Sequence, residues 1–97
     1  MSPDIVKNLI RKGQTETVFF VECPSSSREI IAYINLIQEA QTGHLLIGVK
    51  DCGTVIGLRK AEKQLQQIAK EAIENTPLTF HLVLLVADFK VIVITHS

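Results

Sequence analysis

Positively charged side chains gather in the middle of this sequence. Within fourteen residues the chain carries two carboxylates, Asp51 and Glu62, and four cations, which are Lys50, Arg59, Lys60 and Lys63. Lysine and arginine at this density can hold a phosphate backbone by charge and hydrogen bonds without reading bases. The pattern therefore predicts a nucleic-acid site, and the alternative is an ordinary solvated surface.

A second phosphate site is conceivable at Arg28, which follows three serines. Backbone N–H groups at the start of a helix, together with an arginine, form an anion site. The same stretch carries Glu29 three residues after Ser26, which is the spacing of a capping box. The capping box is the preferred interpretation, and Arg28 is kept as a candidate contact to nucleic acid.

The cysteines and histidines show no pattern typical of a metal site. Cys23 and Cys52 cannot make a disulfide framework, and His44, His81 and His96 are scattered along the chain. Neither residue type has the spacing of a zinc site. We expect reduced thiols, no metal and no cofactor.

The bulk composition limits the kinds of protein this can be. The chain has 97 residues, is 46% hydrophobic, and carries ten Lys and Arg against ten Asp and Glu. We expect one folded domain over residues 1–97, without the overall basic excess of a protein that binds nucleic acid by net charge alone. Since no signal segment opens the chain and the longest apolar run, Leu82–Ala87, is short, we expect a cytoplasmic protein with no membrane partner.

The elements that position these residues follow from hydrophobic periodicity and turn residues. The pattern predicts helices over 3–12, 27–41 and 61–75, strands over 17–22, 78–86 and 90–95, and a glycine-punctuated β-hairpin over 44–58. Apolar stripes on the two long helices must each cover a sheet. We expect an α+β, two-layer sandwich in the order α-β-α-β-β-α-β-β, with a mostly antiparallel sheet of about five strands and a short N-terminal helix.

The hairpin reads G-x-LLIGV-x-D-x-G-x-VIGL from Gly43 to Leu58. This motif, between two amphipathic helices, resembles the Schlafen-type AlbA domain, also called the divergent Alba domain. The resemblance covers Gly13 to Ser97. It implies nucleic-acid binding, and some eukaryotic members of that family cut RNA.

In the active nucleases of that family the resemblance implies three carboxylates that hold a divalent metal at the scissile phosphate. The corresponding positions here are Gln14, Phe19 and Asp51, so only Asp51 matches. Glu16 and Glu22 lie nearby, but strand alternation places them on the other face from Phe19. Asp51, Glu16 and Glu22 are therefore weak catalytic candidates, and we expect no enzyme.

Together these observations predict a non-enzymatic domain that binds DNA or RNA weakly and without sequence preference. One alternative is a protein-interaction module that pairs with a second copy or another chain through open sheet edges. Another is an RNA endonuclease, or a subunit of one, which requires the three candidate carboxylates to converge.

Overall fold

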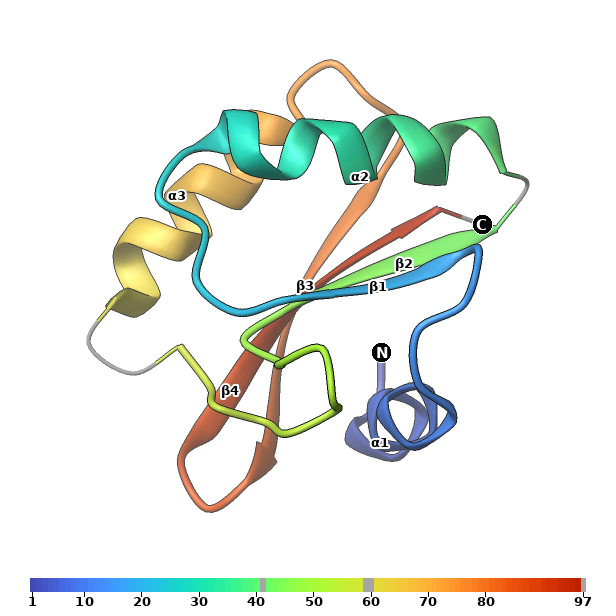
Figure 1. The fold of residues 1–97 in the computed structure, drawn as a ribbon. Helices are drawn as coiled ribbons and strands as arrows, with labels where there is room; N and C mark the ends of the chain where they lie inside the picture. Colours follow the sequence, from blue (N-terminus) through green and yellow to red (C-terminus); the bar gives the residue numbers. More distant parts are fainter. Residues whose placement is uncertain (41, 59–60, 97) are drawn as a thin grey trace.

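The computed structural model describes residues 1–40, 42–58 and 61–96 and has the predicted α+β architecture (Figure 1). Its elements are α1 (Pro3–Lys12), β1 (Val18–Val21), α2 (Ser27–Glu39), β2 (Gly43–Ile47), α3 (Glu62–Ala72), β3 (Thr79–Val86) and β4 (Phe89–His96). The sheet has four strands in the order β1-β2-β4-β3, so the expectation of about five was one too many. In the described part of the chain, no helix combines the length and apolar character needed to cross a membrane.

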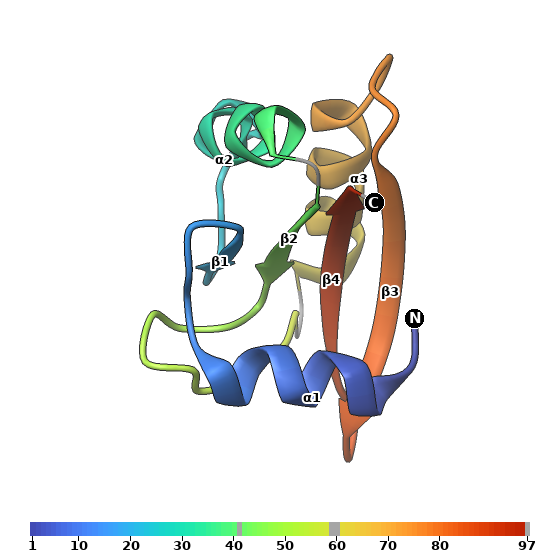
Figure 2. The same cartoon turned by 90° about the vertical axis from the view of Figure 1, so that its right-hand side faces the viewer.

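The sheet is mixed. β1 and β2 run parallel, with Val18 opposite His44 and Val21 opposite Ile47. A parallel pair needs a long crossover connection, and α2 provides it. The other two pairings, β2 with β4 and β4 with β3, are antiparallel, and Ala87 and Asp88 form the tight turn between β3 and β4 (Figure 2).

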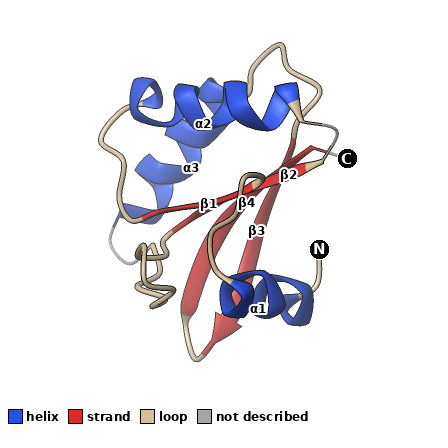
Figure 3. Ribbon diagram, turned by 45° about the vertical axis from the view of Figure 1, so that its right-hand side comes forward, coloured by secondary structure: helices blue, strands red, loops and turns tan. Residues whose placement is uncertain are grey.

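Only the first half of the predicted hairpin is a strand. After β2, residues 48–58 form a loop with one isolated bridge between Val49 and Val55 (Figure 3). Gly48, at φ +105°, turns the chain out of the sheet. Its carbonyl oxygen accepts hydrogen bonds from the N–H groups of Ile56 and Gly57, at 2.9 and 3.0 Å. A Cβ at Gly48 would lie 3.3 Å from the carbonyl oxygen of Gly57, so this close return of the backbone requires glycine.

Helices cover both faces of the sheet, which corrects the expected two layers (Figure 2). On one face α2 and α3 pack over β2 and β4, and the buried cluster there includes Ile34, Leu65 and Ile92. On the opposite face α1 packs mainly on β3. The buried cluster there joins Val6 to Val83, Phe20, Leu46 and Val93, with Leu9 and Ile10 packed against it. These two faces are called the α2/α3 face and the α1 face below.

Candidate nucleic-acid interface

Lys50 lies in a tight turn that follows β2 on the α1 face. Its N–H donates to the carbonyl oxygen of Thr54 at 2.9 Å, and its own carbonyl oxygen accepts from the N–H of Gly53 at 2.8 Å. Lys50 and Asp51 are both exposed. A Cβ at Gly53 would lie 3.5 Å from the backbone oxygen of Ile10. The turn is therefore held against the C-terminal end of α1, as Figures 1 and 2 both show.

This contact brings Lys50 to a helix that carries three more exposed cations. Lys7 and Arg11 are one turn apart on α1, and Lys12 is its last residue. Cations in the last turn of a helix also complement its dipole. We call Lys7, Arg11, Lys12 and Lys50 the α1 surface. Sequence reasoning missed its helical part, since the basic last turn is visible before Gly13 but its contact with residues 50–53 is tertiary.

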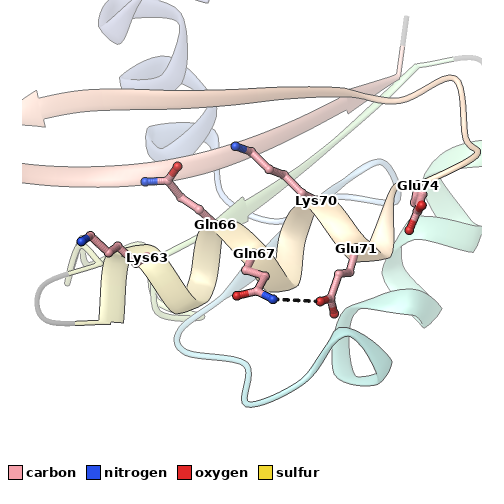
Figure 4. A pocket seen from close by; sticks show the side chains of 6 residues that line it. All are labelled: Lys63, Gln66, Gln67, Lys70, Glu71 and Glu74. Carbon is pink, nitrogen blue, oxygen red and sulfur yellow. Dashed lines mark hydrogen bonds between the residues drawn. The ribbon is translucent and has the colours of Figure 1, made fainter.

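The opposite face carries Lys63. It projects from the outer side of α3 with Lys70 and four polar residues, which together line a shallow hollow of about 520 Å³ (Figure 4). The Lys70 ammonium lies 5.1 Å from the centre of the Phe80 ring, and the Gln67 amide donates to the Glu71 carboxylate at 3.3 Å. The structure thus separates Lys63 from Lys50. Arg59 and Lys60, the other two members of the predicted group, lie outside the described residues.

Arg28 is exposed in the first turn of α2. Ser26 caps this helix without a side-chain hydrogen bond, so the expected capping box is modified. Instead the Glu29 carboxylate accepts from the backbone N–H of Ser25 at 2.8 Å and from its hydroxyl at 2.5 Å. These two bonds lower the pKa of Glu29. A carboxylate therefore lies beside the start of α2, where its charge would repel a bound phosphate.

The three candidate carboxylates do not form a group. Glu16 lies in the bend before β1 and Glu22 follows the strand, so the four residues of β1 stand between them. Among residues 1–40, 42–58 and 61–96, no three His, Cys, Asp or Glu side chains are arranged to hold a metal ion. Asp51 lies in the turn on α1, and neither glutamate is brought to it as part of a metal-binding cluster.

Gln14 and Phe19 stand at the two positions where the resemblance implies a carboxylate in active nucleases, and both stabilise the fold here. The Gln14 amide oxygen accepts a hydrogen bond from the Phe20 N–H at 3.1 Å. Phe19 points to the α2/α3 face, where its ring lies 5.4 Å from the Tyr33 ring at an interplanar angle of 51°. Phe19 and the Asp51 turn are consequently on opposite faces of the sheet.

Two histidines on the α1 face form a polar pair at one end of the sheet. His44 is half-buried, and its Nδ1 is buried with no hydrogen-bond partner among the described residues. Burial, and then the nearby His81, lower the pKa of His44. His81 lies 3.4 Å from the Thr95 hydroxyl through its Nε2. These side chains fit the structural role expected of isolated histidines.

The family assignment rests on a comparison with models of known families. The model described as Schlafen, AlbA_2 matches residues 6–95. Neither the curated proteins nor the solved structures gave a match. Since the matched segment includes every element from β1 to β3, most of α1 and all but the last residue of β4, the chain belongs to the Schlafen AlbA_2 family.

Proposed function

We propose that this domain binds nucleic acid through its phosphates, without cutting it, and that the α1 surface makes the contact. The observation that carries this proposal is the packing of the Lys50 turn on the C-terminal end of α1. It brings the segment that carries exposed Lys50 beside a helix, far away in the sequence, that carries the exposed cations Lys7, Arg11 and Lys12. Such a group can follow a phosphate backbone without reading bases.

The distribution of charge supports this choice of face. The whole chain has a formal net charge of zero. α1 nevertheless carries three cations and one carboxylate, Asp4, which lies in its first turn, away from the Lys50 turn. α2 carries one cation and two carboxylates, and on α3 the single described salt bridge joins Glu62 to Lys90 of β4 at 3.3 Å. Together, α1 and the Lys50 turn carry four cations against two carboxylates, Asp4 and Asp51, which leaves a local excess of positive charge on a neutral protein.

The proposal of binding without cleavage rests on the side chains at the family's catalytic positions. Gln14 offers one neutral oxygen, which already accepts the Phe20 N–H, and Phe19 offers none. A metal ion at a scissile phosphate needs several anionic oxygen ligands. Asp51 alone cannot provide them.

A fluorescence-anisotropy titration with labelled single- and double-stranded RNA and DNA tests this function. Mn²⁺ is present throughout, and the probes are run on a gel afterwards. We expect intact probes, and binding that weakens steeply between about 50 and about 200 mM salt. Cut probes would establish a nuclease, and no binding at tens of micromolar would overturn the proposal.

A matched pair of variants locates the contact. Arg11→Glu with Lys50→Glu reverses two charges on the α1 surface, and Lys63→Glu with Lys70→Glu makes the same change on the other face. We expect the first variant to abolish binding and the second to keep it. The opposite result would move the site to α3, where part of the sequence-predicted group lies.

A further inference from the structure

The two edge strands of the sheet, β1 and β3, differ in whether their outward backbone groups have hydrogen-bond partners. At the β1 edge, the Gln14 side chain accepts the Phe20 N–H at 3.1 Å, and the Thr15 N–H donates to the Val18 carbonyl oxygen at 3.0 Å. These bonds occupy two of the outward backbone groups, the Phe20 N–H and the Val18 carbonyl oxygen, that an additional strand would need. The residues before β1 thereby close this edge.

β3 forms the other edge and is twice as long, eight residues against four. It pairs with β4, and among the described residues no loop or side-chain hydrogen bond reaches its backbone. It contains no charged residue, proline or glycine, and its one irregularity is a bulge near the end, between Leu84 and Val86. Edge strands that avoid association usually carry charged residues, prolines or bulges, which prevent pairing with another chain. β3 is therefore open to a further strand.

Apolar side chains extend the core toward this edge. Leu82 lies opposite Ile92 and Leu84 opposite Lys90, and opposite residues in an antiparallel pair share a face. Both leucines are consequently on the α2/α3 face, beyond Phe80, and they are 39% and 49% exposed. A neighbour on β3 would cover them.

The outer side of α3 adds a pattern of charge. Lys63 stands near its start. Glu71 in its last turn and Glu74 just after it stand at the other end, where Lys70 lies over the Phe80 ring, and α3 runs opposite to β3 (Figure 4). A twofold axis normal to the sheet at β3 would make both β3 and α3 antiparallel to their copies. It would place Lys63 of one copy toward Glu71 and Glu74 of the other. The surface is thus complementary to itself.

We propose that β3 is the interface of a homodimer, in which two β3 strands pair antiparallel and join the sheets of two copies into one. The uncharged strand can face itself without repulsion. Registers centred on Leu82 or Val83 bring the exposed leucines of both copies together, and the charges of the two α3 helices pair. The interface uses the β3 edge and α3. It stands apart from the proposed function because the Lys50 turn and the C-terminal end of α1 lie on the β1 side of the sheet, although α1 also packs on β3 (Figure 2).

Sedimentation velocity over a range of protein concentrations tests the dimer, with the wild type expected to show a concentration-dependent dimer. Leu84→Lys places a charge opposite the apolar side chain of Phe80 or Leu82 of the other copy and is expected to raise the dimer dissociation constant at least tenfold. The matched control is Leu36→Lys, because Leu36 is 48% exposed on α2 and far from β3. It should leave the constant within threefold of the wild type. Circular dichroism checks that both variants fold.

A charge exchange tests the geometry separately. Lys63→Glu is expected to weaken the dimer, and adding Glu71→Lys and Glu74→Lys is expected to restore it. Restoration by added charges cannot come from general damage to the fold. A wild type that stays monomeric at hundreds of micromolar would overturn the proposal and leave the edge to a strand of another protein. A dimer unaffected by Leu84→Lys and by the charge exchange would also overturn it.

Discussion

The side chain of Gln14 takes the place of a neighbouring strand for Phe20, since its amide oxygen accepts the Phe20 N–H at 3.1 Å on the outer edge of β1. The resemblance implies a carboxylate at this position in the family's active nucleases. In this chain the side chain at this position instead stabilises β1 through its hydrogen bond. It also leaves β3 as the open edge of the sheet.

Replacing Gln14 with alanine should leave the Phe20 N–H without its partner. We expect Gln14→Ala to lower the free energy of unfolding by about 1 kcal/mol, the usual net contribution of such a hydrogen bond. Gln14→Glu keeps an acceptor oxygen and should lose less. Urea unfolding followed by circular dichroism compares them, and an equal loss in both variants would show that the acceptor is unimportant.

A side chain at Gly43 should be costly because of packing. A Cβ there would lie 3.0 Å from Cγ2 of Ile37 and 3.3 Å from the backbone oxygen of Thr17. We expect Gly43→Ala to cost about 1–3 kcal/mol of stability, as overpacking does. The cost should be smaller when Ile37 is already alanine, which a double-mutant cycle measures. Additive losses would contradict the contact.

The free energy of unfolding should decrease as the pH is lowered below the ordinary pKa of histidine. Burial, and then His81, hold the pKa of His44 below its usual 6.5. Just below that pH the unfolded chain binds more protons than the folded one, so the free energy of unfolding decreases until the pH reaches the folded pKa. Urea unfolding at about pH 7.5 and about pH 5.5 measures this loss. We expect a smaller loss in His44→Leu, and an unchanged loss would assign the effect to other groups, with His81 the next to test.

Charge reversal at the α1 surface should change the salt dependence of binding as well as its strength. Each cation that contacts a phosphate contributes about one unit to the slope of log K against log salt concentration. We expect Lys50→Glu to reduce this slope by about one unit and Lys63→Glu to leave it unchanged. Anisotropy titrations at several salt concentrations give both slopes. Equal slopes would argue against a phosphate contact at Lys50.

Restoring a family carboxylate at Phe19 should not create a nuclease. Phe19 packs beside Tyr33 on the α2/α3 face, away from the Asp51 turn. We expect Phe19→Glu, alone or with Gln14→Glu, to lower the melting temperature and to leave labelled RNA intact with Mn²⁺. Cleavage by the double variant that is lost with Asp51→Ala would show that the three positions converge after all.

Most of the elements could be predicted from the sequence, because each has a strong local pattern. The stripes of α1, α2 and α3 have helical spacing, and the β-rich runs of β1, β3 and β4 end at proline or turn residues. The second half of the hairpin could not be predicted in this way. Val55 is apolar because it packs on the α1 face, and Leu58 because it is buried on the α2/α3 face. Both residues cover the core from a loop.

The same loop explains why the predicted basic group is divided. Between Val55 and Leu58 the chain passes from one face of the sheet to the other. Lys50 and Lys63 are therefore close in sequence and lie on opposite faces, while Lys50 comes near α1, about forty residues earlier. Local patterns carry no information on such contacts.

The parallel pairing of β1 with β2 has a consequence for the order of assembly. β3 and β4 are joined by a two-residue turn and can pair at once, whereas β1 meets β2 only after the whole of α2 has been placed between them. Contacts between segments far apart in the chain form later, because the intervening loop loses more entropy. The β3–β4 hairpin should therefore be the first part of the sheet to form, and the strand proposed to join two copies would be exposed before the domain is complete.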